Sequence, residues 1–196
     1  MLEHNELMSI LPATPKPGEG GSAAGSMELK LERCTIRDWR PDDAESLANH
    51  ANNRRVWLGL RDAFPHPYSI EDAQRFLQRS IAEDPRKNFC IEIDASPVGG
   101  IGIRIGQDVH RHVAGLGYWL GQEFWGHGVM TEVVPAFVNY CFDRFPLNRI
   151  YAECYSNNPA SARVLEKSSF VLEGRLRKNV VKDGHVLDSL LYAKTN

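Results

Sequence analysis

Hydrophobic and polar residues follow strand-like or helix-like patterns from residue 27 to the end of the chain. Apolar and charged residues alternate over Leu29–Arg37, as in a half-buried strand. Apolar residues at helical spacing predict a helix over Pro41–Asn53, with Pro41 in the first turn, where proline is tolerated. Ser69 and Asp72 stand three positions apart at the start of an apolar stripe, which predicts a capped second helix.

The rest of the chain continues with strands, a long helix and a hairpin. Turns are predicted at Ser96-Pro97 and over Gln107–Arg111, and Asp183-Gly184 is a favoured pair for a two-residue hairpin turn. Because hairpins are mixed with helical crossovers, we expect an α+β (mixed α/β) fold with helices packed on a mixed sheet. The predicted strands are Phe89–Asp94, Val98–Ile105, Val113–Leu120, Arg149–Tyr155, Phe170–Val181 and His185–Tyr192, and the helices are Gly128–Phe145 and a short one containing Ser161–Lys167.

Composition changes once along the chain, near residue 27. Residues 12–26 are rich in Pro, Gly, Ser and Ala and show no hydrophobic periodicity. Such a segment cannot bury enough apolar surface to offset the entropy of ordering it. We therefore predict a flexible tail over residues 1–26 and one folded domain over residues 27–196.

The overall composition argues against several classes of protein. The 196 residues are 42% hydrophobic, and 25 acidic against 23 basic side chains give a net charge of −2. This balance lacks the basic excess of nucleic-acid-binding proteins, and no stretch reaches the ~18 apolar residues of a membrane span. The first residues lack the features of a secretory signal, so we expect a cytoplasmic protein with no nucleic-acid or membrane partner. The widely spaced cysteines, which indicate reduced thiols, are Cys34, Cys90, Cys141 and Cys154.

The most informative segment places a glycine turn, residues 126–128, between a strand and a helix. Glycines let the backbone approach a ligand closely, and the free amides of a first helical turn favour an anion such as pyrophosphate. Thr131 occupies the place of a third glycine, and no Gly-Lys-Ser/Thr loop is present, so neither NAD nor ATP is the expected ligand. A turn of this kind also serves close packing alone.

Several ordered motifs resemble one protein family. Gly117–Glu132 resembles the acetyl-CoA-binding segment of the GNAT acetyltransferase superfamily, in its Trp-Gly-x-Gly-x-x-Thr-Glu form. Asn158-Pro-Ala-Ser161 resembles the next motif of that family, and Trp57–Tyr68 and Glu173–Arg177 add to the match. The resemblance covers about residues 29–194. Within the family, the sequence is similar to the branch that contains ribosomal-protein N-terminal acetyltransferases.

The resemblance implies an enzyme that transfers acetyl from acetyl-CoA directly to a primary amine, which is a protein N-terminus or a small amine. It implies one GNAT-like domain whose mostly antiparallel mixed sheet has splayed strands and helices on both faces. Strand amides would bond the pantetheine and the thioester carbonyl, and amides of the glycine turn would hold the pyrophosphate. The residues implied in acetyl-CoA binding are Tyr118, Trp119, Leu120, Trp125, Gly126, His127, Gly128, Val129, Met130, Thr131, Asn158 and Ser161.

Departures from the family pattern decide the catalytic assignment. Leu165 stands where many members have the tyrosine that protonates the leaving thiolate. The serine of the Asn-x-x-Ser motif is the proposed substitute in this branch, so Ser161 is expected to be the general acid. Glu123 stands where the family has Gln or Arg, and we expect it to point to solvent. Ser169 replaces a glycine, which predicts an altered chain path there.

No residue is assigned as the general base, although an attacking ammonium must first lose a proton. The usual glutamate position holds Ala114-Gly115. Strand alternation sets Glu153 opposite Cys154, so Glu153 faces away if Cys154 faces the cofactor. A water relay is then the route for the proton. The weak base position also leaves open a second function, a non-catalytic acyl-CoA-binding regulatory module.

The acceptor side is assigned to aromatic residues between the first two helices. By resemblance, Trp57, Phe64, His66 and Tyr68 would form a wall of the amine site. The alternative is that Trp57 and Phe64 fill the core, as large aromatic residues usually do.

Cys154 is interpreted as a small buried strand residue, because no histidine stands beside it to activate the thiol. No metal is expected, since the pair His110 and His112 lacks an evident third ligand. Dimers are common among similar proteins, but the sequence carries no sign of one.

Overall fold

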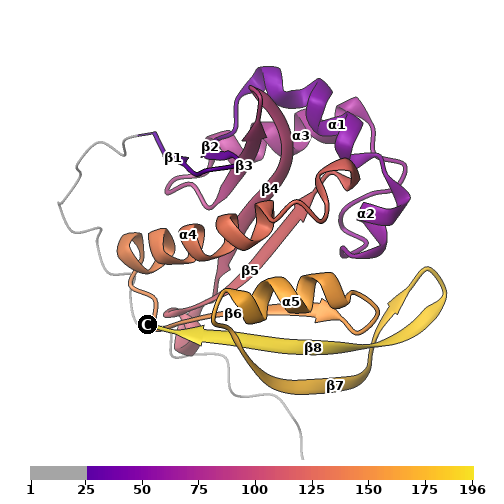
Figure 1. Cartoon of the computed structure of the whole chain (residues 1–196). Helices are drawn as coiled ribbons and strands as arrows, with labels where there is room; N and C mark the ends of the chain where they lie inside the picture. The colour runs from indigo at the N-terminus through magenta and orange to yellow at the C-terminus, as the bar shows by residue number, and fades with distance from the viewer. Residues whose placement is uncertain (1–25) are drawn as a thin grey trace, which may run out of the picture.

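The computed structural model describes residues 26–196, and the predicted tail falls almost wholly outside this part of the chain. The predicted boundary between tail and domain therefore stays a prediction. The described residues form eight strands and five α-helices (Figure 1). The strands are β1 (Glu28–Lys30), β2 (Thr35–Asp38), β3 (Asn88–Ile93), β4 (Ser96–Ile105), β5 (Val113–Leu120), β6 (Arg149–Tyr155), β7 (Val171–Lys182) and β8 (His185–Thr195). The helices are α1 (Ala44–Ala51), α2 (Arg54–Leu58), α3 (Ile70–Ala82), α4 (Val129–Arg144) and α5 (Pro159–Lys167).

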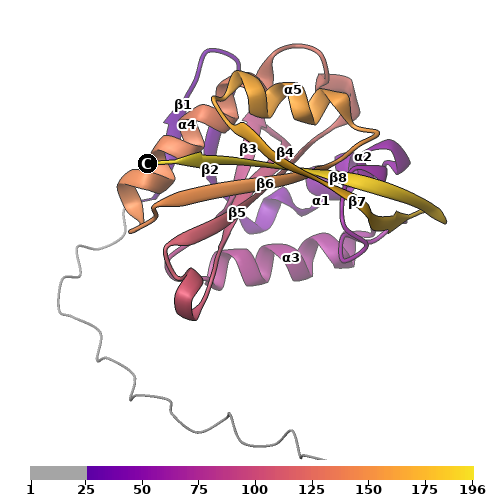
Figure 2. The same ribbon diagram turned by 90° about the horizontal axis from the view of Figure 1, so that it is seen from below.

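All eight strands belong to one sheet, in the order β1-β2-β3-β4-β5-β6-β8-β7. Every neighbouring pair is antiparallel except β5 and β6, which run parallel because α4 connects them as a crossover. Helices α4 and α5 cover one face of the sheet and α1 and α3 the other (Figure 2). The predicted α+β fold, with a mostly antiparallel sheet and helices on both faces, is confirmed.

Two hydrophobic clusters hold the layers together. The larger one joins the sheet to α4 and α5 and includes Phe89, Phe137 and Leu165, each nearly inaccessible to solvent. The smaller one lies under α1 and α3 and includes Trp39, Leu47 and Leu77. None of the described helices has the length and apolar character needed to span a bilayer.

The predicted capping pair is confirmed at the start of α3. The Ser69 hydroxyl accepts the Asp72 N–H at 3.2 Å, and the Asp72 carboxylate accepts the Ser69 N–H at 2.9 Å. The hairpin turn at Asp183-Gly184 is also confirmed, with positive φ at both residues, as such turns require.

Three local predictions were wrong. The segment Leu29–Arg37 is two strands joined by a turn, because the apolar positions change phase at residues 32–33. The turn between β3 and β4 lies at Asp94-Ala95, both with positive φ, while residues 96–97 already belong to β4. Helix α2 was missed because its five residues are too few for a periodic signal; its Asn53 cap accepts the Arg55 N–H at 2.9 Å.

Candidate active site

The sheet opens between β5 and β6. The two strands are paired only from Val113 with Arg149 to Leu116 with Ala152. Beyond that point β6 stays paired with β8 as far as Tyr155. Among residues 26–196, Gly117–Leu120 of β5 pairs only with β4. The expected splayed strands are therefore present, and we call the gap between residues 117–120 and 153–155 the opening.

The ladder between β4 and β5 decides which amides face the opening. Gly106 N–H bonds the Val113 carbonyl at 2.8 Å, and Gly121 N–H bonds the Val98 carbonyl at 2.7 Å. Antiparallel bonding alternates, so Trp119 uses its polar groups on Gly100, while those of Tyr118 and Leu120 point into the opening. The Trp119 amide is used by the ladder in this conformation, so the amides of Tyr118 and Leu120 are the ones that face the opening.

Trp125 closes the end of β5. Its indole N–H donates to the Leu120 carbonyl at 2.8 Å, although 44% of the residue is exposed. Next along the chain, Gly126 and Gly128 have φ of +81° and +80°, where a side chain is strained. His127 between them is exposed. The glycine turn thus needs glycine at both positions for its backbone conformation.

Helix α4 presents unused N–H groups at its start. Within residues 26–196, the amides of Gly128, Val129 and Met130 donate no hydrogen bond. Thr131 differs, because its N–H and its hydroxyl both donate to the Gly128 carbonyl, at 3.0 and 2.6 Å. Thr131 therefore closes the first helical turn and, in this conformation, offers no free donor to a ligand. The remaining amides and the positive end of the helix dipole favour an anion.

A basic residue that the sequence analysis missed stands beside this turn. Arg33, in the turn between β1 and β2, binds Glu132 with its guanidinium and, at 3.2 Å, with its backbone N–H. Its Nε would lie 3.7 Å from a Cβ at Gly128. Ninety-nine positions separate Arg33 from Glu132, so no local pattern connects them. The pair offsets the carboxylate charge in the first turn of α4.

Ser161 faces the opening from the first turn of α5. The Asn158 side chain caps this helix by accepting the Ser161 N–H at 3.1 Å. The Ser161 hydroxyl lies 2.9 Å from the Tyr118 hydroxyl. Burial raises the pKa of the Tyr118 phenol, and a hydrogen bond with Ser161 opposes this effect. The structure thus brings together three residues that were predicted to bind acetyl-CoA or to act in catalysis: Asn158, Ser161 and Tyr118.

Cys154 lies on the same side of the sheet, and Ser161 is close enough to lower the pKa of its thiol. Burial raises the pKa of this thiol above its ordinary value, so Cys154 remains a neutral, poor nucleophile. The four cysteines are all free and buried. These properties fit the interpretation of Cys154 as a buried strand residue rather than as a site of covalent chemistry.

The predictions for Ser169 and Glu123, two departures from the family pattern, have different outcomes. Ser169 has a φ of +64°, the left-handed conformation that a glycine usually adopts after a helix. Helix α5 therefore ends in the same way as it would with glycine at this position. The prediction of an altered path was therefore wrong. Glu123 is exposed, as expected, and its carboxylate lies 3.0 Å from Nδ1 of His50, which ties the connector after β5 to α1.

Glu153 faces the other side of the sheet, as the alternation of β6 predicts. It is exposed and accepts a hydrogen bond from the Asn179 amide of β7 at 2.8 Å. Asn179 also donates to Ser189 at 2.8 Å, so the carboxylate has a fixed neighbour.

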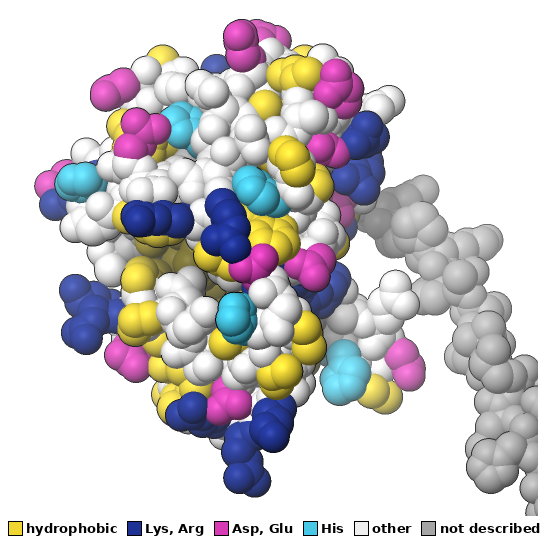
Figure 3. Space-filling model, turned by 90° about the vertical axis from the view of Figure 1, so that its right-hand side faces the viewer, with side chains coloured by type: hydrophobic (Ala, Val, Ile, Leu, Met, Phe, Trp, Pro, Cys, Tyr) yellow, Lys and Arg dark blue, Asp and Glu magenta, His cyan; other side chains and the backbone are white. Residues whose placement is uncertain are grey.

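The acceptor-side aromatic residues separate into two pairs. Trp57 stacks on His66 with ring centroids 5.6 Å apart, next to the hairpin of β7 and β8. The Lys182 ammonium of that hairpin lies 3.4 Å from the centre of the Trp57 ring and 2.7 Å from Asp62. Figure 3 views the side with α2 and the hairpin, where hydrophobic side chains lie in a recess and basic side chains on its rim.

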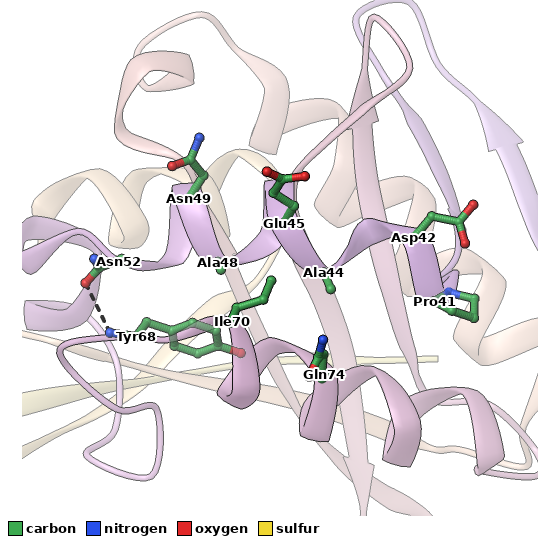
Figure 4. A pocket seen from close by; sticks show the side chains of 10 residues that line it. All are labelled: Pro41, Asp42, Ala44, Glu45, Ala48, Asn49, Asn52, Tyr68, Ile70 and Gln74. Atoms are coloured by element: carbon green, nitrogen blue, oxygen red, sulfur yellow. Dashed lines mark hydrogen bonds between the residues drawn. The ribbon is translucent and has the colours of Figure 1, made fainter.

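Phe64 and Tyr68 form the second pair, with centroids 4.7 Å apart, and join the core under α1 and α3. Only 6% of Tyr68 is exposed, and its ring lines the space between α1 and α3. Its N–H binds Asn52 at 3.1 Å beside a cavity of about 580 Å³ between α1 and α3 (Figure 4). The core-filling alternative, stated for Trp57 and Phe64, thus describes Phe64, which packs against the smaller cluster. Tyr68 is buried there as well, Trp57 is half-buried, and His66 is exposed.

Comparison with known proteins gives a consistent family. A family model described as "Acetyltransferase (GNAT) domain" matches residues 33–171. The chain is 29% identical to YdaF of Bacillus subtilis (strain 168), provisionally named a ribosomal N-acetyltransferase, over 83% of this chain and 91% of that protein. It is 26% identical to the ribosomal-protein-serine acetyltransferase of Escherichia coli (strain K12), over 71% and 80%.

The fold is also similar to solved structures. One is RimL, a ribosomal L7/L12 α-N-protein acetyltransferase in complex with coenzyme A. The TM-score is 0.75 at 22% identity, with 84% of this chain and 95% of that chain covered. At this identity the likeness establishes the fold alone.

Proposed function

The chain belongs to the acetyltransferase (GNAT) family and is an acetyl-CoA-dependent N-acetyltransferase, and we propose that its acceptor is a protein N-terminus. The relatives named above as ribosomal-protein acetyltransferases support this class of acceptor. A small primary amine is the other acceptor that the family allows.

The glycine turn and the opening fit the two ends of acetyl-CoA. The unused amides of Gly128, Val129 and Met130 are donors, and a pyrophosphate offers only acceptors. The N–H groups of Tyr118 and Leu120 and the carbonyl of Tyr118 face the opening, where they can bond a pantetheine chain. The Leu120 carbonyl already accepts the Trp125 indole N–H. The assignment rests on one observation: the free edge of β5 is followed, after the short connector of residues 121–125, by a glycine turn whose free amides favour an anion.

The reaction then follows from the groups around the opening. A neutral amine attacks the thioester carbonyl, and a strand amide directed into the opening stabilises the oxyanion, typically by about 3 kcal/mol per donor. Ser161, on the same side as Cys154, donates a proton to the departing sulfur. The proton of the amine leaves through water, since no side chain is assigned as its base.

Release of free thiol from acetyl-CoA, measured against a panel of acceptors, tests the proposal. The panel pairs each short peptide with a copy whose N-terminus is already blocked, and adds free amino acids and polyamines. We expect turnover with unblocked peptides only. Turnover with small amines alone would contradict the proposal and identify a small amine as the acceptor.

The alternative, a non-catalytic acyl-CoA-binding module, has a separate outcome. It predicts that acetyl-CoA binds tightly in calorimetry while no acceptor releases thiol, and that Ser161→Ala changes nothing. A large loss of turnover in Ser161→Ala, with acetyl-CoA affinity retained, excludes it. ATP and NAD serve as the calorimetric controls for ligand class.

A further inference from the structure

The hydroxyl of Ser161 is held by a phenol from the opposite side of the opening. Tyr118 Oη lies 2.9 Å from Ser161 Oγ and 3.4 Å from the Ser161 carbonyl oxygen. Tyr118 comes from β5, 43 positions earlier in the chain, and its side chain is packed against the larger hydrophobic cluster. Ser161 is therefore one member of a pair of half-buried hydroxyls.

We propose that Tyr118 supplies, through Ser161, the proton that the departing thiolate takes up. This inference rests on the proposed function, because it concerns the same reaction. When the carbon–sulfur bond breaks, its electron pair goes to sulfur, which takes the Ser161 Oγ proton. Ser161 Oγ takes the phenolic proton of Tyr118. Tyr118 recovers a proton, through water, from the amine nitrogen, which loses one as the amide forms.

The chemistry of the two hydroxyls explains why both are needed. A serine that gives up its proton alone is left as an alkoxide, and an unpaired charge is costly in a buried site. A phenol has an ordinary pKa of about 10, close to the roughly 8.5 of a thiol, so transfer from phenol to thiolate is nearly balanced. Burial raises the pKa of the Tyr118 phenol, and it also raises the pKa of the nearby Cys154 thiol. Because burial shifts phenol and thiol in the same direction, the phenol stays protonated at neutral pH and its acidity stays comparable with that of a thiol in the same place.

Tyr118 also provides the phenol that α5 lacks, because Leu165 stands where many family members have a tyrosine. Leu165 is fully buried, so α5 offers no second hydroxyl to the opening at that place. Asn158 fixes the backbone of Ser161, and Tyr118 fixes its side chain. Because the Tyr118 phenol acts through Ser161, this side chain is a positioning and proton-supplying group, and only the Tyr118 backbone faces the pantetheine chain.

Four variants test the relay with the best acceptor of the panel. They are Tyr118→Phe, Ser161→Ala, the double variant, and Tyr151→Phe as the matched control. Tyr151 is a half-buried tyrosine of β6 whose ring lies against Gly115, on the side of the sheet away from Ser161. Tyr118→Phe keeps the strand amide and removes only the phenolic oxygen.

We expect kcat of Tyr118→Phe to fall about ten-fold or more, with KM for acetyl-CoA within about two-fold of wild type. The double variant is expected to match Ser161→Ala, because a relay cannot be broken twice. Tyr151→Phe should keep wild-type kcat. A Tyr118→Phe enzyme as fast as wild type, or a double variant with multiplied losses, would overturn the relay.

A proton inventory in mixtures of light and heavy water separates a relay from a structural role. The wild-type rate should depend non-linearly on deuterium content, because two protons move, and Tyr118→Phe should give a straight line. If Tyr118→Phe does not fold, fluorinated tyrosine at position 118 replaces it, and kcat should follow the acidity of the phenol. A kcat independent of that acidity overturns the relay. A wild type that acetylates no amine overturns the proposed function together with the relay.

Discussion

The two sides of the opening are built in different ways. On the cofactor side, the contacts that fix the backbone are local: Gly128 and Thr131 bond within one turn, and Asn158 caps a helix by accepting the N–H of Ser161, three residues ahead. Long-range pairs such as Arg33 with Glu132 join side chains to this framework. On the acceptor side, the hairpin of β7 and β8 is fastened to the region of α2 by pairs far apart in the chain. Lys182 and Asp62 are separated by 120 positions, and Arg54 and Asp183 by 129.

This difference suits the two ligands. An anion held by backbone amides needs a fixed backbone conformation, which two glycines and a helix start provide within six residues. An amine acceptor meets side chains instead, and side chains can change without altering the sheet. We therefore expect substitutions on the two sides to affect different binding constants.

The largest effect should come from Gly128→Val, which places a β-branched residue at a φ of +80°. Strain of about 1–2 kcal/mol, together with lost hydrogen bonds to phosphate, predicts roughly 100-fold weaker binding of CoA in calorimetry. Gly174→Val is the matched control, because that glycine of β7 has neither a positive φ nor a neighbour that a Cβ would meet. An equal loss in both variants would show that the glycine turn does not hold CoA.

The same contrast explains which features could be predicted from the sequence. The capping pair Ser69 and Asp72 and the glycine turn were predictable because neighbouring residues carry their whole signal. Even the missed turn at residues 32–33 was marked by a change of phase in the apolar positions. The pairing of Tyr118 with Ser161 was not predictable, because it depends on where two strands separate.

Long-range contacts also limited the assignment of the acceptor side. The sequence groups Trp57 with Tyr68 in one aromatic segment, whereas in the fold Trp57 is half-buried beside the hairpin and Tyr68 belongs to the core. Only the packing of α1 on α3 decides that Tyr68 is buried. The local sequence pattern therefore identifies this segment as aromatic but does not show which of its residues are buried in the core.

A smaller effect is expected from Lys182→Met, which tests the acceptor side. The Lys182 side chain is 2% exposed at the tip of a hairpin, a position held by the Trp57 ring and Asp62. Methionine keeps the bulk but loses the charge, so the free energy of unfolding should fall by about 1–2 kcal/mol. Loosening of the hairpin should raise KM for the acceptor about ten-fold while the Kd of CoA stays at its wild-type value.

The exposed Lys178 of β7 provides the control, because Lys178→Met removes the same charge from the same strand. It should leave both constants unchanged. If Lys182→Met weakens CoA binding as much as acceptor binding, the two sides are coupled and the contrast between them does not hold.

The smallest effect should come from Arg54→Ala, which removes the other connection of the same hairpin. The Arg54 side chain is 59% exposed and its partner Asp183 33%, so water and salt screen the pair. Such pairs contribute about 0.5 kcal/mol or less, and KM for the acceptor should stay within about two-fold of wild type. The hairpin is then positioned mainly by the buried Lys182 ammonium, which lies against the Trp57 ring and Asp62. An Arg54→Ala enzyme as impaired as Lys182→Met would instead mean that net charge across the hairpin, rather than burial of Lys182, positions the acceptor side.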